Sequence, residues 1–200
     1  DAGGFADIPQ RIRTHFASRE YDAVVLFLVD GFGWRFVEHF QDTPFIKRLN
    51  RSGTVEKLTS QFPSTTAAHV TTIHTGLPVG ESGVYEWFYY EPQLDRIIAP
   101  LLFSFAGDKQ RDTLKTAGVD ASRLFPSRTI YDDLKGPGVE SHVFGVRDYT
   151  PSIYSNVVMR GACMHGFKTL SEALINLGLL LEKQTRPTYI QLYFDQVDSL

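Results

Sequence analysis

The sequence predicts an α/β fold with a mostly parallel central sheet that is flanked by helices. The run Asp22–Val29 is almost entirely apolar, which is the pattern of a strand buried on both faces of a parallel sheet. Stretches with apolar residues at helical spacing alternate along the chain with short apolar runs. This alternation is typical of parallel strands that are connected by helices.

The first half of the chain carries three helix signals and a second strand signal. A short helix is expected at Trp34–Phe40, and residues 42–53 combine a cap, a proline and a closing Gly53 with apolar residues at helical spacing. Residues 54–62 alternate between apolar and polar side chains like a strand. Residues 64–76, STTAAHVTTIHTG, have a hydroxyl-rich start and a glycine stop, which predicts a third helix.

The second half begins with a different kind of segment. Residues 85–128 are irregular and rich in Tyr, Phe and Pro, and we interpret them as an insertion over the sheet. Residues 127–146 predict a helix, a Gly-Pro-Gly turn and a strand, and residues 187–198 predict a last strand that ends in carboxylates. Between these two segments lies a long amphipathic helix. Its apolar face consists of Leu170, Leu174, Leu177 and Leu181.

No element follows the last predicted strand to complete the sheet, so we expect residues 1–200 to be the N-terminal part of a longer single domain. The chain starts at Asp1 with neither a methionine nor an apolar leader. A targeting segment could therefore have been removed from the chain, and the sequence does not decide the cellular compartment.

The composition is that of a soluble globular protein, and it excludes several classes. The chain is 42% hydrophobic and 22% charged, with a formal net charge of −3 and no Lys/Arg-rich run, so nucleic-acid polymers are not expected as partners. No apolar run approaches the roughly 20 residues that cross a bilayer. Cys163 is the one cysteine, which excludes an intrachain disulfide and a zinc site built from cysteines. The oligomeric state does not follow from the sequence.

Two aspartates follow the ends of predicted strands. Asp30 comes directly after the run 22–29, and Asp198 follows the last strand. In open parallel sheets, ligands bind beyond the carboxyl ends of the strands, so both carboxylates are placed where they could contact one. Aspartate and glycine are also ordinary turn residues, so position alone leaves both interpretations open.

A group of hydroxyls stands at the expected start of the helix within residues 64–76. Pro63 precedes the three hydroxyl residues Ser64, Thr65 and Thr66. Unpaired backbone N–H groups and the positive end of the helix dipole favour an anion such as phosphate or sulfate at this place, and they lower the cost of ionising a hydroxyl. Serine and threonine are also the usual helix caps, so an ordinary cap is the alternative.

Four segments carry a resemblance that covers nearly the whole chain. They are VDGFGW (29–34), FPSTTAAHVTTIHTGLPVGESGV (62–84), YDDLKGPGVESHVFG (131–145) and YFDQVDSL (193–200). In this order they resemble the alkaline phosphatase superfamily, and within it the type I phosphodiesterase/nucleotide pyrophosphatase branch. The resemblance implies that residues 1–200 are the N-terminal part of a single alkaline phosphatase-like catalytic domain, with residues 85–128 as an insertion on the substrate side.

The resemblance also implies site residues. Asp30 matches the first metal ligand of the family, and Thr66 matches the nucleophile, which also binds a metal ion. Asp198 matches the aspartate of an Asp-x-x-x-His element whose histidine would lie two residues beyond the end of the sequence. Asp195 is interpreted as a supporting or solvated residue.

The implied chemistry is metal-dependent hydrolysis of a small phosphorylated substrate, at a phosphodiester or pyrophosphate bond, through a phosphothreonine formed on Thr66. Two divalent metal ions about 4 Å apart would hold the phosphoryl group. Carboxylate and imidazole ligands favour zinc, and Mn and Fe stay open. The family has further ligands downstream of residue 200, so the isolated 200-residue segment is expected to be inactive.

One position departs from the family's pattern. Where nucleotide pyrophosphatases have an asparagine that donates to a phosphate oxygen, this sequence has Trp87, whose indole N–H can donate one hydrogen bond. Glu86 is the other candidate for substrate contact, and its carboxylate would repel a phosphate or bind a cation. A phosphomonoester, phosphonate or sulfate hydrolase of the same superfamily is therefore an alternative, and so is a catalytically silent binding or scaffold domain.

The remaining polar residues give weaker signals. His69 and His74 lie five residues apart on the expected helix and are interpreted as packing or supporting residues and not as ligands. His142 and His165 are too isolated in the sequence for an assignment. Arg147 and Tyr149 follow a predicted strand and are candidates for contact with the substrate.

Overall fold

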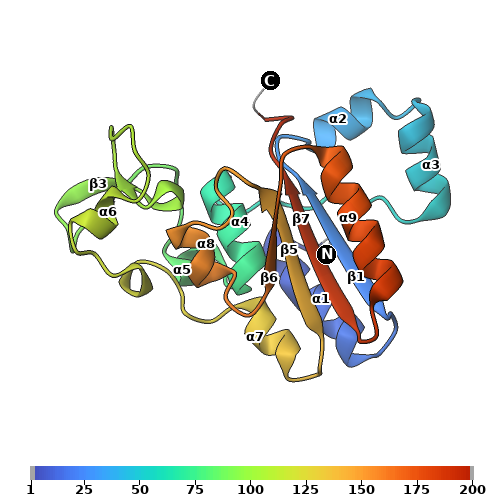
Figure 1. Cartoon of the computed structure of the whole chain (residues 1–200). Coiled ribbons are helices and arrows are strands. Elements are labelled where there is room, and N and C mark those ends of the chain that lie inside the picture. Colours follow the sequence, from blue (N-terminus) through green and yellow to red (C-terminus); the bar gives the residue numbers. More distant parts are fainter. Residues whose placement is uncertain (1–2, 199–200) are drawn as a thin grey trace.

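The computed structural model describes residues 3–198, which form two sheets. The larger sheet has the strand order β1-β7-β5-β6, and its neighbouring strands are parallel. Its strands are β1 (Ala23–Val29), β5 (Glu140–Val146), β6 (Cys163–Phe167) and β7 (Thr188–Phe194). The predicted α/β fold with a mostly parallel central sheet is confirmed (Figure 1).

Helices cover both faces of this sheet (Figure 1). The longest of them in the described chain, α9 (Leu170–Lys183), lies across one face. The opposite face is covered by α1 (Ile8–Ala17), α4 (Thr66–Thr75) and α7 (Ile130–Lys135). The other described helices are α2 (Trp34–His39), α3 (Pro44–Ser52), α5 (Val79–Ser82), α6 (Thr113–Thr116) and α8 (Ile153–Val158), with 3-10 turns at Phe5–Asp7, Pro100–Leu102 and Ala121–Arg123.

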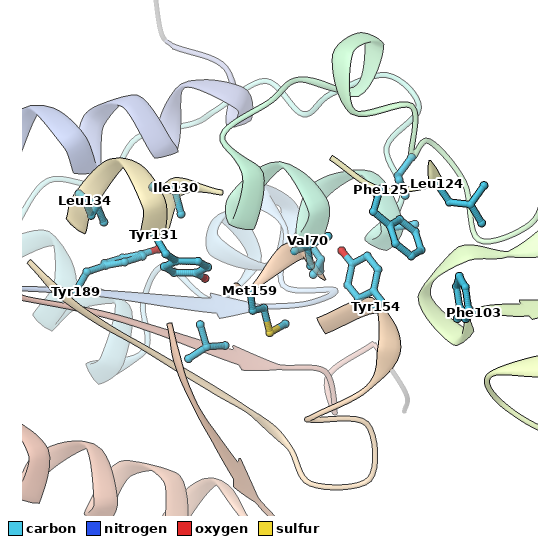
Figure 2. Close-up of a cluster of buried hydrophobic side chains, with 14 of the residues drawn as sticks. Val70, Phe103, Leu124, Phe125, Ile130, Tyr131, Leu134, Tyr154, Met159 and Tyr189 are labelled. Atoms are coloured by element: carbon cyan, nitrogen blue, oxygen red, sulfur yellow. The ribbon is translucent and has the colours of Figure 1, made fainter. Parts of the chain in front are cut away.

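The side chains of β7 alternate between two hydrophobic clusters. Ile190 and Leu192 pack in the smaller cluster under α9, whereas Tyr189 packs in the larger cluster on the opposite face. There Tyr189 stacks on Tyr131 of α7, with ring centroids 6.1 Å apart (Figure 2). Both tyrosines are buried, so this cluster fixes α7 against the sheet.

Hydroxyl side chains cap the start of four of the described helices, including α4, for which the sequence predicts it. Each accepts a hydrogen bond from the backbone N–H three residues ahead, which satisfies one of the unpaired donors of the first turn. The caps are Thr65 for α4, Thr129 for α7, Ser152 for α8 and Thr169 for α9. Gly76, with a φ of +70°, ends α4 in the left-handed conformation, so the predicted glycine stop is confirmed.

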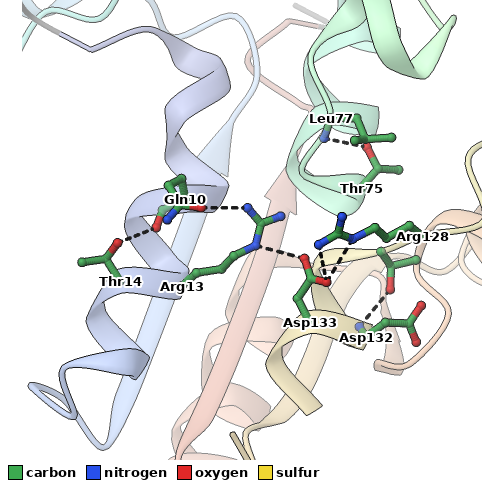
Figure 3. Close-up of polar contacts among 9 residues, drawn as sticks. Gln10, Arg13, Thr14, Thr75, Leu77, Arg128, Asp132 and Asp133 are labelled. Carbon is green, nitrogen blue, oxygen red and sulfur yellow. Dashed lines mark hydrogen bonds and ion pairs between the residues drawn. The ribbon is translucent and has the colours of Figure 1, made fainter. Parts of the chain in front are cut away.

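A charged cluster joins α1 to α7 (Figure 3). Arg13 of α1 forms an ion pair with Asp133 of α7, with 3.1 Å between Nε and Oδ2. Arg128 donates to the other oxygen of Asp133 at 2.9 Å, and Gln10 accepts a hydrogen bond from Arg13. The Arg13 and Asp133 side chains are only 25% and 19% exposed, so this pair is less screened by water than a surface pair would be.

Two predicted segments differ from the structure. Residues 54–62 form no strand: Thr59 makes a single bridge with Gly4, and Phe62 is 94% exposed. An alternating pattern favours an extended chain, but no neighbouring strand pairs with this one. The segment 85–128 is not wholly irregular, because it contains an antiparallel sheet. That sheet consists of β2 (Tyr89–Glu91), β3 (Arg96–Ala99) and β4 (Ser104–Phe105).

The prediction that the first strand is buried on both faces is wrong. In the described chain β1 lies at an edge of the sheet, and Val25 and Phe27 are each 43% exposed.

The predicted apolar face of α9 is correct except at Leu174, which is 46% exposed. Leu180 packs on the smaller hydrophobic cluster in its place. The sequence analysis did not predict α1, α8 or β6.

Replacement of the cap Thr129 by valine should lower the free energy of unfolding by about 2 kcal/mol. The Thr129 side chain is buried, accepts from the Asp132 N–H and donates to the Arg160 carbonyl, so both partners lose a hydrogen bond where water cannot replace it. Thr169 is a matched control, because it caps α9 in the same way but is exposed. Urea unfolding of Thr169→Val should show a loss of about 1 kcal/mol. Equal losses at the two caps would contradict this account.

Candidate active site

Asp30 and Thr66 lie together at the carboxyl end of the parallel sheet. Asp30 directly follows β1, and its N–H donates to the carbonyl of Phe194 at 2.9 Å, which continues the β1–β7 ladder by one residue. Thr66 is the first residue of α4. Its Oγ1 donates to Oδ2 of Asp30 at 3.1 Å, across 36 residues of chain.

The neighbouring hydroxyl, that of Thr65, serves as the helix cap. Its Oγ1 accepts from the Ala68 N–H at 3.3 Å and donates to the Tyr85 carbonyl at 2.9 Å. The cap interpretation of the sequence therefore applies to Thr65. Because Thr65 carries the cap, the Thr66 hydroxyl is directed to the Asp30 carboxylate instead.

Gly31 brings Asp198 close to this pair. Gly31 has a φ of +73°, and its N–H donates to Oδ1 of Asp30 at 3.0 Å. A Cβ at Gly31 would lie 3.0 Å from the Cα of Asp198, so only glycine permits this approach. The Asp198 side chain is exposed, and within residues 3–198 no hydrogen bond joins it to Asp30 or Thr66.

Two tyrosines donate hydrogen bonds to carboxylates at the same edge. Tyr193 donates to Oδ2 of Asp30, and Tyr149 donates to Oδ2 of Asp195, each at 2.6 Å. Burial, and then the hydrogen bond to its carboxylate, raises the pKa of each phenol well above its ordinary value. Both tyrosines therefore remain hydrogen-bond donors at any physiological pH.

A cavity of about 130 Å³ opens beside Thr66, between α4, α8 and the sheet. Trp87, Leu101 and Leu102 line it from the segment that contains the antiparallel sheet, and Val70, Val143 and Met159 line it from the main fold. Arg111 also lines the cavity, with its guanidinium 5.9 Å above the ring of Tyr149. The walls are thus mainly apolar, with one cation near the tyrosines.

Two buried polar side chains line the same cavity without satisfying all their polar atoms. Within the described chain, His74 Nε2 and both polar atoms of the Gln191 amide have no hydrogen-bond partner, and both residues are fully buried. An unsatisfied buried polar group costs about 1–3 kcal/mol, and such groups in an apolar cavity are typical of ligand sites.

The two residues assigned to substrate contact have different positions. Trp87 is 39% exposed and lines the cavity, so its ring is available to a ligand there. Glu86 is absent from the described lining residues, and its Oε1 accepts from the backbone N–H of Trp87 at 2.6 Å.

Comparison with protein families gives a match that covers most of the chain. The family model "Type I phosphodiesterase / nucleotide pyrophosphatase" matches residues 24–200. The chain belongs to this family. The match covers 177 of the 200 residues (200 − 24 + 1 = 177) and includes Asp30, Thr66 and Asp198. The chain matches none of the curated proteins and none of the solved structures with which it was compared.

Membership supports a phosphate-ester hydrolase function at the level of the family. The resemblance noted in the sequence is therefore confirmed. Within residues 3–198, no helix has the length and hydrophobicity that a membrane-spanning helix requires.

The surroundings of Asp30 are electrostatically suited to a cation. The carboxylate is half-buried, and the hydrogen bonds described for it come from three neutral donors, namely Gly31 N–H, Thr66 Oγ1 and Tyr193 OH. These donors orient the carboxylate without neutralising its charge. The carboxylate oxygen Oδ2 of Asp30 and the hydroxyl oxygen Oγ1 of Thr66 lie 3.1 Å apart, and as a pair of oxygen ligands they fit a divalent metal ion.

The sequence analysis did not single out Tyr193 or Arg111. Tyr193 could have been found from the alternation of β7, since it points to the same face as Tyr189, toward α4. Arg111 lies in a segment with no periodic pattern, and its approach to Tyr149 follows only from the tertiary structure. The two histidines of α4 are packing residues, as expected. The rings of His69 and Phe5 pack together with their centroids 4.3 Å apart, and His74 is hydrogen-bonded to the Tyr131 hydroxyl.

The buried His74 should make stability depend on pH. Burial lowers the pKa of His74 from its ordinary value of 6.5 to about 3, so the folded protein keeps the imidazole neutral while the unfolded chain binds a proton. The free energy of unfolding should therefore be fully retained above about pH 6.5. It should fall by up to about 1.4 kcal/mol per pH unit as the pH drops toward 3.

Urea unfolding between about pH 7 and about pH 5 measures this slope. His74→Gln should flatten it, whereas the control His39→Gln, at an exposed position on α2, should leave it unchanged. An equally steep slope in His74→Gln would show that other groups control the acid sensitivity.

Proposed function

We propose that this protein hydrolyses phosphodiester or pyrophosphate bonds in small phosphorylated substrates, with Thr66 as the nucleophile in a two-metal site. The observation that carries the proposal is the hydrogen bond of 3.1 Å from Thr66 Oγ1 to Asp30 Oδ2 in a member of this family. It joins the start of α4 to the end of β1, where ligands of parallel sheets bind.

The position of Thr66 supports its role as nucleophile. It occupies the first turn of a ten-residue helix, where N–H groups and the helix dipole stabilise negative charge on a hydroxyl oxygen or a bound phosphate. The Asp30 carboxylate accepts a hydrogen bond from the Thr66 hydroxyl. This hydrogen bond orients the lone pairs of Thr66 Oγ1 toward a phosphorus atom in the cavity. Tyr193 holds Asp30 in place through the same carboxylate oxygen.

The reaction then has two displacements at phosphorus. In the first, Thr66 Oγ loses its proton and forms a bond to phosphorus, while the bond from phosphorus to the alcohol or phosphate leaving group breaks; the leaving group departs with the electron pair and takes up a proton. In the second, water attacks phosphorus and loses a proton, the bond between Thr66 Oγ and phosphorus breaks, the phosphorylated product is released, and Oγ takes up a proton to restore the hydroxyl.

Asp30, Thr66 and Asp198 are the residues of this chain that would hold the metal ions. Bound divalent ions, for which zinc is the expected identity, would neutralise phosphoryl oxygens and assist ionisation of the nucleophile and the leaving group. The Gly31 turn supports this assignment, because it places the backbone of Asp198 against the Asp30 loop.

The cavity supports a substrate with an apolar or aromatic group. Trp87, Leu101 and Leu102 offer apolar contacts, and Arg111 offers a cation to an anionic group. The alternative is a phosphomonoester, phosphonate or sulfate hydrolase, which is favoured by Trp87 at the position of the family's asparagine. Glu86 supports neither reading, since its carboxylate is turned to the Trp87 N–H.

Side-by-side assays of bis-p-nitrophenyl phosphate and p-nitrophenyl phosphate on the full-length gene product test the function. Thr66→Ala should lower kcat for the preferred substrate at least about 1000-fold, because it removes the attacking oxygen. Ser64→Ala is the matched control, since it removes an exposed hydroxyl two residues away and should retain activity.

Preference for the monoester would move the assignment to the phosphatase alternative. Full activity in Thr66→Ala would exclude Thr66 as the nucleophile. Absence of turnover with every ester would favour the silent binding domain.

Metal removal tests the role of Asp30 separately. Dialysis against a chelator should abolish diesterase activity, and added zinc should restore it in the parent protein. Asp30→Asn should bind less zinc and should need at least about tenfold more for half-maximal activity, because an amide is a much weaker ligand than a carboxylate. Measurement of bound zinc by elemental analysis checks this. Activity that survives chelation would contradict the two-metal proposal.

A further inference from the structure

A second group of metal-ligating side chains lies on β5 and β6, away from Asp30 and Thr66. His142 is the third residue of β5, and Cys163 and His165 are the first and third residues of β6. In the parallel register, His142 is opposite Cys163 and Phe144 is opposite His165. The three side chains therefore project from the same face of the sheet, near the amino ends of the strands.

The ligand atoms of these three residues converge. One nitrogen of each imidazole and the sulfur of Cys163 all lie within 4.8 Å of one another. His142 Nδ1 and His165 Nε2 are 3.1 Å apart. The His165 ring stacks on Phe144 with centroids 4.5 Å apart and an interplanar angle of 15°, which holds the imidazole in this orientation.

These separations match a zinc-type site. Zn–N bonds of about 2.0 Å and a Zn–S bond of about 2.3 Å in tetrahedral geometry place neighbouring ligand atoms about 3.3–3.6 Å apart. The two imidazole nitrogens are already near that spacing. The sulfur lies within 4.8 Å of both nitrogens, and the exposed Cys163 side chain can rotate to bring it to that spacing.

We propose that His142, Cys163 and His165 bind a zinc-type divalent metal ion, with water in the fourth position. The site needs one cysteine only, and its ligands come from two strands, so the exclusion of a zinc site built from cysteines does not apply to it. His142 and Cys163 line an adjacent hollow, together with Lys135 and with Glu140 and Arg186, which form an ion pair at 3.4 Å. The bound ion would cross-link β6, an edge strand of the described sheet, to β5.

Cobalt titration of the purified, freshly reduced protein tests the proposal, because a thiolate ligand gives Co²⁺ a near-ultraviolet charge-transfer band. Cys163 is the only cysteine in the sequence, so this band cannot come from the Asp30–Thr66 site. The parent protein should show the band with one equivalent of Co²⁺, and Zn²⁺ should remove it by displacement. Cys163→Ser should abolish it.

The histidine variants show whether the site is built from all three residues. His142→Gln and His165→Gln should each weaken the Co²⁺ affinity more than about tenfold. Loss of a residue that only hydrogen-bonds a metal ligand already costs about tenfold, and loss of a ligand itself should cost at least as much. His39→Gln is the matched control, because it removes an exposed imidazole far from the cluster in sequence and should leave the affinity unchanged. Far-ultraviolet circular dichroism of the metal-free variants checks that they fold.

A second measurement on the unmodified protein does not depend on any variant. Zn²⁺ should slow alkylation of Cys163 by iodoacetamide more than about tenfold, since a metal-bound thiolate is protected, whereas Mg²⁺ should have no effect. The proposal is overturned if no charge-transfer band forms, if the band is indifferent to both histidines, or if Zn²⁺ leaves alkylation unchanged. None of these outcomes depends on phosphoesterase activity.

Discussion

The parallel pairing of β1 with β7 is the interaction on which the candidate active site depends. The register places Val29 opposite Phe194, so Asp30 and Asp195 leave the sheet side by side. Tyr193, one residue before the end of β7, then reaches the Asp30 carboxylate. A slip of one residue would turn Tyr193 to the opposite face. Because β7 is paired with β1 on one side and β5 on the other, its backbone resists such a slip.

The second constraint is the division of roles between Thr65 and Thr66 at the start of α4. Adjacent residues in a helix's first turn point in different directions, so one hydroxyl can cap the backbone while the other faces the sheet. The small side chains of Ala67 and Ala68, both fully buried, allow the helix to approach closely. The position of the Thr66 hydroxyl thus follows from a helix that is held at its cap and along its buried face.

The two ends of the sheet differ in chemistry. At the carboxyl end, Asp30, Asp195 and Asp198 place carboxylate groups near a cavity with mainly apolar walls. Near the amino end, two imidazoles and a thiol gather on β5 and β6. Oxygen donors suit a site that handles phosphate through hard or borderline ions, whereas nitrogen and sulfur donors suit a site that holds a softer ion in place. The sheet separates these two ligand sets.

The sequence by itself determined much of the local structure: the apolar runs of β1 and β7, the hydroxyl start of α4, and the glycine stop of α4. These features depend on residues close together in the chain, so spacing and residue type predict them. It also placed Asp30 and Thr66 in one site, but only through the resemblance of whole segments to a family. Residues 54–62 have a strand pattern that the fold does not use, because a strand also requires a neighbour.

Only the tertiary structure decided which distant residues meet. The contact of Tyr193 with Asp30 spans 163 residues, and that of His142 with His165 spans two separate strands. No local pattern encodes such contacts, since they depend on strand order and register, which are fixed by the summed packing of two hydrophobic clusters. His142 and His165 therefore had no assignment from the sequence, yet lie 3.1 Å apart in the fold because β5 and β6 pair in parallel.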